Sequence, residues 1–134
     1  MIGSVLMKKM IENELSNLII SKAILIHKAL GPGLLESVYE SILMEELMLA
    51  GVEVRRQVAL PVVWRNRKIE HGYRIDLLVE NLIICEIKAT ELIHPVHTCQ
   101  LLTYLRLSEK KLGRLINFHT PMLKEGIRRV VNGL

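Results

Sequence analysis

The stretch RIDLLVENLIICEIKAT, residues 74–90, decides the fold. Two apolar runs flank a short polar segment, which is the pattern of a β-hairpin. Asp76, Glu86 and Lys88 nevertheless interrupt the apolar runs. An unpaired charge inside a core costs roughly several kcal/mol, so charges placed here need one another or a ligand. The hairpin therefore marks both the sheet and the candidate site.

The turn of this hairpin decides whether Asp76 and Glu86 meet. Side chains alternate along a strand, so the two share a face only if paired residue numbers have an even sum. A two-residue turn at 80–81 gives an odd sum and directs Asp76 away. A three-residue turn at 79–81 gives an even sum and sets Asp76 opposite Ile84, about 7–8 Å diagonally from Glu86 between Cα atoms. A bulge near Asp76 has the same effect.

Two carboxylates this close predict a metal site. They repel each other by about 4 kcal/mol at an effective dielectric near 20, and Lys88 offsets only part of that repulsion. A divalent cation offsets the rest, and all-oxygen ligation suits Mg²⁺ or Mn²⁺. Such an ion can activate a water while Lys88 stabilises developing charge. The alternative is a salt bridge between Glu86 and Lys88 on a solvated strand; the apolar surroundings and Asp76 favour the site.

Three helices and a mixed sheet are predicted around the hairpin. Apolar residues recur at helical spacing over residues 8–30, 34–50 and 95–111. Gly-Pro-Gly at 31–33 should end the first helix, Gly51 should cap the second and Gly113 should end the third. The second helix is expected to bury the stripe Leu35, Val38, Ile42 and Leu49.

Alternating apolar and polar residues predict strands over 52–60, 61–66, 72–79, 82–88, 114–119 and 123–131, with a turn at 65–68. Strands that follow one another and then cross over a helix predict a mixed central sheet flanked by helices, in an α/β or α+β architecture. The 134 residues fit a single domain, 1–134. Half of them are hydrophobic and few are aromatic, so Leu, Ile and Val should form the core.

Composition limits the partners and the compartment. The net charge of +4 is compatible with a polyanion but does not require one. The chain shows neither a secretory leader nor an apolar run long enough for a membrane span. Cys85 and Cys99 lie in apolar surroundings and are expected to be reduced core residues of a cytoplasmic protein. His94, His97 and Cys99 fit no usual zinc spacing.

Basic residues gather near the first strands. They are Arg55, Arg56, Arg65, Arg67 and Lys68. Such a cluster can contact a phosphate backbone without reading sequence. It can equally be a solvated sheet edge whose charges prevent aggregation.

Several ordered motifs resemble a known family. GLLESVY at 33–39 fits the pattern G-x-x-E-x-x-Y, and it is accompanied by HKALGPGLLESVYE, CEIKAT, QLLTYL and LINF. Together they resemble the GxxExxY protein family, which is placed in the PD-(D/E)xK nuclease superfamily with its restriction-endonuclease-like fold. The resemblance extends over residues 27–132. Ile75 stands where the superfamily name expects Pro, and His119 stands where a small residue is expected; neither departure removes a ligand.

The resemblance implies roles for six residues. Asp76 and Glu86 would be metal ligands, Lys88 the catalytic lysine and Glu36 an additional catalytic and metal-binding acid, while Gln100 and Tyr104 would border the site and contact substrate. From spacing alone, Glu36 is also explained as an acid favoured by a helix N-terminus. A solvated face equally explains the polar stripe of the third helix. Tyr39 is expected to hold its helix to the sheet, and His27 to cap or pack.

Two functions remain open. The first is a Mg²⁺-dependent nuclease, a hydrolase of phosphodiester bonds acting on DNA or, less favoured, RNA. The second is a nucleic-acid-binding or complex-forming module that keeps the nuclease fold without turnover. The intact Asp76, Glu86 and Lys88 favour the nuclease. The small size favours the module, because few residues remain for substrate selection; a homodimer or a partner protein would relieve that shortage.

Overall fold

The computed structural model describes residues 2–134, with side chains from residue 11 onward. In chain order the elements are α1 (Ile2–Leu30), α2 (Glu36–Leu49), β1 (Val54–Ala59), β2 (Val62–Trp64), β3 (Arg67–Ile69), β4 (Arg74–Val79), β5 (Ile83–Lys88), α3 (Pro95–Ser108), β6 (Leu112–Asn117), the 3-10 helix η1 (Leu123–Gly126) and β7 (Ile127–Val131). Within these described residues, no helix is long and apolar enough to cross a membrane.

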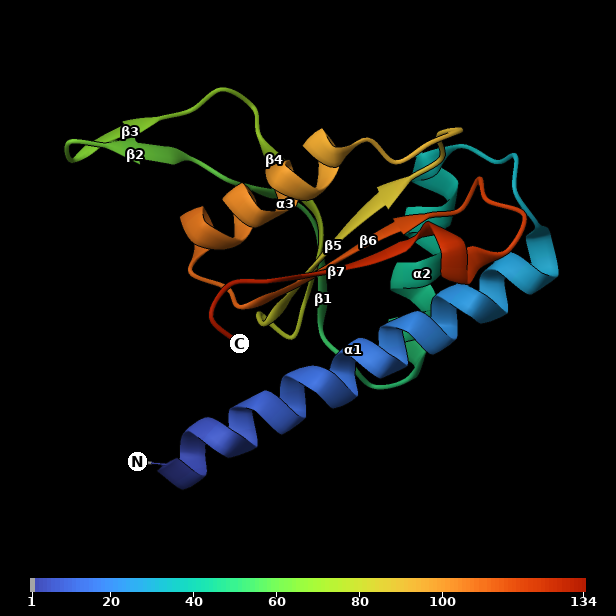
Figure 1. Ribbon diagram of the computed structural model, residues 1–134, viewed down its shortest axis with the longest axis horizontal. Coiled ribbons are helices and arrows are strands. Elements are labelled where there is room, and N and C mark those ends of the chain that lie inside the picture. Colours follow the sequence, from blue (N-terminus) through green and yellow to red (C-terminus); the bar gives the residue numbers. More distant parts are fainter. Residues whose placement is uncertain (1) are drawn as a thin grey trace.

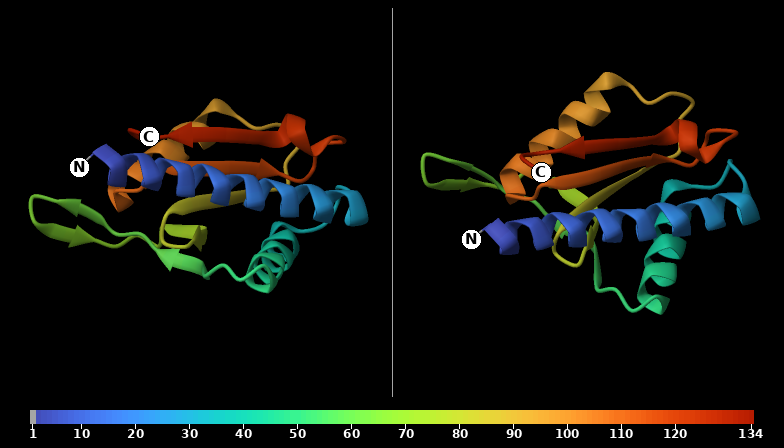
Figure 2. Two further views of the ribbon diagram at one scale, coloured as in Figure 1. Left: turned by 90° about the horizontal axis from the view of Figure 1, so that it is seen from below. Right: turned by 60° about the horizontal axis from the view of Figure 1, so that its bottom comes forward.

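The central sheet has five strands in the order β1-β4-β5-β6-β7. The β5–β6 pair is parallel and the other pairs are antiparallel, so the predicted mixed sheet is confirmed. The helix α3 forms the crossover between the two parallel strands and covers one face, while α1 and α2 cover the other (Figure 1). The strands β2 and β3 form a separate ribbon that projects from the body (Figure 2).

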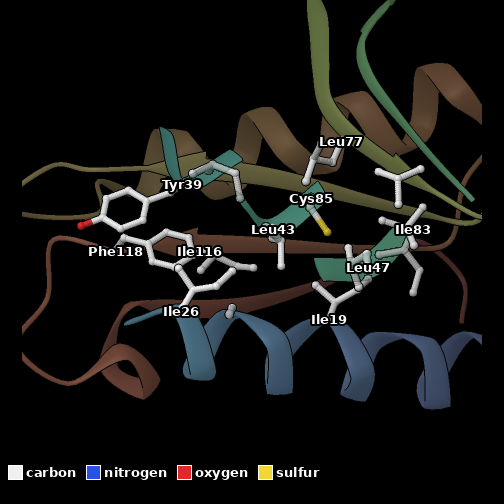
Figure 3. Packing of buried hydrophobic residues seen from close by; sticks show 14 of the residues in the cluster. Ile19, Ile26, Tyr39, Leu43, Leu47, Leu77, Ile83, Cys85, Ile116 and Phe118 are labelled. Carbon is white, nitrogen blue, oxygen red and sulfur yellow. The ribbon is translucent and has the colours of Figure 1, made fainter. Parts of the chain in front are cut away.

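Each face of the sheet carries its own hydrophobic cluster. The larger cluster joins α1 and α2 to the sheet through residues such as Ile19, Leu43 and Cys85 (Figure 3). The rings of Tyr39 and Phe118 stack within it, with centroids 4.3 Å apart and planes 7° from parallel. The smaller cluster joins α3 to the opposite face. As expected, the aliphatic residues predominate, and the few aromatics anchor the end of the sheet where β6 finishes.

The buried face of α2 is not the expected one. Its buried residues are Tyr39, Glu40, Leu43 and Leu47. Of the expected stripe, Leu35, Val38 and Leu49 are exposed and Ile42 is half-buried. Large apolar residues occur all around this helix, so their spacing does not single out a face. A tyrosine that stacks and hydrogen-bonds takes the central buried place, and a buried acid lies beside it.

Gly113 was expected to end the third helix, but it lies inside β6. The helix ends at Glu109, whose backbone takes the left-handed conformation with φ 57°. Glycine is needed at 113 for packing, because a Cβ there would lie 2.9 Å from Leu101 Cδ1 on α3. The strand expected over 123–131 is divided into η1 and β7. Cys85 is buried as expected, whereas Cys99 is exposed on α3; both thiols are free.

Candidate active site

The β4–β5 hairpin has a three-residue turn over 80–82. Glu80 and Asn81 take left-handed conformations, with φ of 51° and 55°. Leu77 pairs with Cys85, and Val79 pairs with Ile83. The numbers of the paired residues therefore have an even sum, as a three-residue turn requires, but the turn begins one residue later than expected. Continued by one pair, this register sets residue 76 against residue 86, so the two acidic residues are opposite rather than diagonal neighbours.

The side chains of Asp76 and Glu86 interlock across the two strands. The Asp76 N–H donates to Glu86 Oε2 at 2.8 Å, and the Ile87 N–H donates to Asp76 Oδ2, also at 2.8 Å. The regular pairing of β4 with β5 ends at Leu77, so these carboxylates satisfy backbone donors that a ladder would otherwise pair. The bond engages only one of the two carboxylate oxygens of Glu86.

The strands β1 and β4 exchange sheet faces beside Asp76. Gln57, in the middle of β1, has φ 52°, a left-handed conformation rare for such a residue. Before this point Val54 and Leu77 pack in the larger cluster, whereas beyond it Val58 and Ile75 pack in the smaller cluster on the other face. The two strands thus exchange sheet faces next to Asp76, as strands do at a β-bulge.

Gln57 and Glu40 complete the acidic side of the site, and sequence reasoning assigned them no role. The Gln57 amide donates to Glu40 Oε1 at 2.7 Å and to Asp76 Oδ1 at 3.3 Å. Glu40 is buried and also pairs with Arg56 at 3.4 Å. Glu40 lies one helical turn beyond Glu36, on the same side of α2. This spacing from Glu36 was the signal in the sequence that could have assigned Glu40 to the site.

Burial and neighbouring carboxylates raise the pKa of both Glu86 and Asp76. Burial is the largest cause of the rise in the pKa of Glu86 to about 8, and the charge of Asp76 is the second. Burial also raises the pKa of Asp76, with a contribution from Glu40, while the Ile87 N–H and Lys88 lower it. Excess negative charge in a buried place disfavours ionisation unless a cation is bound.

Lys88 ends β5 beside this pair. It is half-buried, and its positive charge lowers the pKa of both Asp76 and Glu86. Its carbonyl accepts a bond from the Phe118 N–H at 2.9 Å, which continues the parallel pairing with β6. The backbone of Lys88 is therefore fixed from the neighbouring strand.

The segment after Lys88 is held by Asn117, a fully buried residue that sequence reasoning did not assign a role. Its Oδ1 accepts from the Thr90 N–H at 3.1 Å, and its Nδ2 donates to the Thr90 carbonyl at 2.8 Å. The same Oδ1 accepts from the His119 N–H at 3.2 Å. Asn117 pairs with Lys88 in the parallel register, so one side chain fixes where the chain turns after the lysine.

The G-x-x-E-x-x-Y motif positions Glu36 against the same segment. Gly33 has φ 111°, which only glycine adopts readily. The Tyr39 hydroxyl donates to the Gly31 carbonyl and accepts from the Leu34 N–H at 3.2 Å, so it ties down the loop before α2. This confirms that Tyr39 holds its helix to the sheet. Glu36, the first residue of α2, accepts from the Ala89 N–H at 3.2 Å.

A cleft of about 570 Å³ opens between α2 and the sheet. The polar residues that line it are Glu36, Ser37, Glu40, Gln57 and Asp76. The structure thus brings Glu36 and Asp76 to one cleft, with Glu86 bonded to Asp76 behind it. A cleft lined by oxygen donors suits a hydrated cation or a polar ligand better than an apolar one.

The two predicted substrate contacts differ in their surroundings. Tyr104 is buried in the smaller cluster; burial, and next the charge of Glu86, raise the pKa of its phenol. Gln100 lies one helical turn before it and is exposed. His94 and His97 form the capping box that begins α3. His27 packs on the other face, where its Nε2 lies 2.8 Å from the Thr120 carbonyl.

Among the residues that the structure describes, no group of three or more His, Cys, Asp or Glu side chains is arranged to hold a metal ion. The predicted set of Glu36, Asp76 and Glu86 therefore remains a prediction. The donors present nevertheless fit Mg²⁺, which commonly binds proteins through one or two carboxylates and keeps several waters. A cation bound between Asp76 and Glu86 would favour their ionised forms and so lower both raised pKa values.

Comparison with known proteins agrees with this architecture. No curated protein and no solved structure matched the chain. A family model described as the PD-(D/E)XK nuclease superfamily matches residues 13–130, a range that begins in α1 and ends in β7 and contains every residue of the candidate site. The chain therefore belongs to the PD-(D/E)XK nuclease superfamily.

Proposed function

We propose that the protein is a metal-dependent nuclease that hydrolyses phosphodiester bonds in DNA, with RNA as the less favoured substrate. The observation that carries this proposal is the pair formed by half-buried Asp76 and buried Glu86 beside Lys88. Such a pair is costly to keep ionised, and neither carboxylate is needed to fill the core. The G-x-x-E-x-x-Y motif further supports the narrower assignment to the GxxExxY family, and the two free thiols support a reducing, cytoplasmic location.

Asp76 and Glu86 are the residues that would hold Mg²⁺ or Mn²⁺, with Glu36 as an additional acid at the cleft. When bound, the ion would supply a Lewis acid and lower the pKa of an attacking water. Asp76 is oriented for this by Gln57 and by the Ile87 N–H, so its carboxylate needs little reordering.

Lys88 would act on the charge that develops during the reaction. Its ammonium lies close enough to Asp76 and Glu86 to affect their ionisation, so it lies close to any ion that they hold. A positive charge there stabilises the pentavalent phosphate more than the ground state. Tyr104 and Gln100 of α3 would border the substrate on the other side of the site.

A cleavage assay tests the proposal directly. Wild type is incubated with Mg²⁺ or Mn²⁺ and a panel of single- and double-stranded DNA and RNA, and Lys88→Ala is compared with it. We expect Lys88→Ala to lose most cleavage, by about 10²-fold or more, because one preorganised charge contributes on that order to turnover. Binding measured in Ca²⁺, which should prevent turnover, should change little.

The matched control is Lys124→Ala, which removes the same charge from an exposed residue of η1. It should cleave as wild type does. If wild type cleaves no substrate of the panel and still binds nucleic acid with Lys88 removed, the nuclease proposal fails. The protein would then be a binding module that keeps the fold without turnover.

A further inference from the structure

The β2–β3 hairpin projects from the domain without contributing to its core. It forms a two-stranded sheet in which Val62 pairs with Ile69 and Trp64 pairs with Arg67. All three views show it extending away from the sheet and the helices (Figure 1, Figure 2). Among the described side chains, neither hydrophobic cluster includes a residue of β2 or β3. Stability of the fold therefore does not explain this hairpin.

The tip of the hairpin combines an aromatic ring with guanidinium groups. The side chain of Trp64 is 63% exposed, although tryptophan is among the costliest side chains to leave in water. The Arg65 guanidinium carbon lies 5.7 Å from the centroid of its ring. Arg67 lies directly across from Trp64 and so projects on the same face. The charge of Lys68, in contrast, is offset by Glu70 at 3.2 Å.

This combination suits a sugar–phosphate backbone. Arginine forks match phosphate oxygens, and an exposed aromatic ring packs against sugars and bases. An acidic protein partner would satisfy the arginines but would give the tryptophan no specific role. A two-stranded ribbon also has the width that the major groove of a duplex accepts, about 12 Å.

The hairpin is connected directly to the strands that carry the candidate active site. The strand β1 enters it at Ala59 and β4 leaves it at Arg74, and these two residues are paired. Gln57 and Asp76 lie only two residues further into the sheet. Arg65 lies eight residues beyond Gln57 in the sequence, which corresponds to at most about 26 Å of extended strand. That reach equals about seven to eight base pairs of duplex.

Aromatic residues continue between the hairpin and the site. Tyr73, at the base of the hairpin, is 45% exposed, and its ring centroid lies 6.4 Å from that of Tyr104 on α3. Tyr104 in turn packs in the smaller cluster with Ile75, the neighbour of Asp76 in β4. A strand of nucleic acid bound at the carboxylates can therefore pass over the exposed ring of Tyr73, which Tyr104 supports from α3, toward Trp64.

We propose that the β2–β3 hairpin is an arm that binds duplex nucleic acid flanking the active site, with Arg65 and Arg67 on phosphates and Trp64 against the groove. For its ligand the inference rests on the proposed nuclease function. The arm would make the affinity depend on the length of the duplex, because the cleft alone is too small to contact a long one.

The first test uses the intact protein, because Trp64 is its single tryptophan. Intrinsic fluorescence therefore reports on the arm alone. Titration with a DNA duplex of about 16 base pairs, longer than the arm's reach, in Ca²⁺ should change the Trp64 emission and protect it from a soluble quencher. Saturable binding by an independent method, with unchanged emission and quenching, would overturn the inference.

The second test removes the two charges. In Arg65→Ala/Arg67→Ala, two phosphate contacts are lost, and the slope of log K against log salt should fall by about 2. Each contact multiplies the ratio of Kd at about 200 mM and 50 mM salt by about 3.5, so that ratio should fall about twelvefold. Lys111→Ala/Lys124→Ala removes the same charge outside the hairpin and should keep the wild-type slope. Equal slopes of log K against log salt in the two double variants would contradict the proposal that the hairpin binds nucleic acid.

The third test measures reach. A loop-closed duplex of about 6 base pairs is shorter than the distance from Gln57 to Arg65, whereas one of about 16 base pairs exceeds it. Wild type should bind the longer duplex more tightly, and Arg65→Ala/Arg67→Ala should lose that advantage while retaining its melting temperature. An equal loss for single strands of the same lengths would overturn the assignment to duplex.

The outcomes separate the arm from the proposed activity. Wild type that cleaves nothing but shows the fluorescence change, the salt slope and the length effect would refute the nuclease and leave the arm in place. Wild type that cleaves, with arm variants that bind as tightly as wild type, would refute the arm alone. A dimer of wild type that Trp64→Ala converts to monomer, without loss of DNA affinity, would show that the hairpin contacts a second copy and would also refute it.

Discussion

Replacing Glu86 with Gln should remove a pH-dependent destabilisation of the metal-free protein. Glu86 is 6% exposed, and burial together with the charge of Asp76 raises its pKa from 4.5 to about 8. A carboxyl whose pKa is higher in the folded protein than in the unfolded chain stabilises the fold fully below the unfolded pKa. That stabilisation is lost as the pH rises through the folded pKa. The window for Glu86 therefore extends from about pH 4.5 to about pH 8.

The expected magnitude is large for one side chain. The two pKa values differ by about 3.5, and one pKa unit corresponds to about 1.4 kcal/mol. Wild type should thus lose about 2 to 3 kcal/mol between pH 5 and pH 7, and about 5 kcal/mol in all by pH 9. Asp76 adds to the loss with the same sign, because its pKa is also raised. A small domain has only about 5–15 kcal/mol of total stability.

Urea unfolding at a series of pH values in a chelator measures this effect. Gln at position 86 keeps an acceptor for the Asp76 N–H but does not ionise, so the difference between Glu86→Gln and wild type should grow in favour of the variant as the pH rises. Glu45→Gln, an exposed residue of α2, is the control and should follow wild type at every pH.

A difference that stays constant from pH 5 to pH 8, or a variant less stable than wild type at pH 8, would refute the reasoning. The cause would then be that solvent or Lys88 already satisfies the charge of Glu86. Addition of Mg²⁺ at pH 8 should stabilise wild type by mass action and leave Glu86→Gln nearly unchanged.

Three further expectations concern single side chains. Asp76→Asn should weaken Mg²⁺ or Mn²⁺ binding in calorimetry by at least tenfold, about 1.4 kcal/mol, and unchanged affinity would remove Asp76 from the ligand set. Asn117→Ala leaves the buried N–H and C=O of Thr90 without partners and should cost about 2–4 kcal/mol in urea unfolding; a cost near zero would mean that water replaces the amide. Tyr39→Phe keeps the stacked ring but loses both hydroxyl bonds, so it should cost about 1–2 kcal/mol, and proteolysis of the loop at Gly31 should accelerate.

Periodicity was sufficient to predict the mixed sheet, but the meeting of the two acids depended on the turn, because a two-residue turn would have directed Asp76 away from Glu86. The E-x-K strand reads as β because its apolar residues leave no helical alternative, and the even sum depends only on the length of the turn. Its position shifted by one residue because both Glu80 and Asn81 adopt left-handed conformations, so the turn begins at residue 80 instead of 79. Asn adopts that conformation readily, whereas Glu seldom does.

Residues that act through hydrogen bonds were harder to find. Gln57 carries no periodic signal, because its role comes from a left-handed backbone conformation. Beside this residue the side chains of both β1 and β4 change from one sheet face to the other. Asn117 reads as a polar interruption of an apolar strand, and only the parallel pairing with Lys88 reveals what it fixes. The burial of Glu40 was not expected, since the apolar residues of α2 favoured a different face of the helix.

The contrast between the two cysteines makes the protein convenient for distance measurements. Cys85 is sealed in the core, so a thiol-reactive dye should attach selectively to the exposed Cys99 of α3 without any substitution. The lone tryptophan of the projecting hairpin is then a natural energy-transfer donor to that dye. The native chain therefore carries an energy-transfer pair that reports the distance between the projecting hairpin and α3, with or without bound nucleic acid.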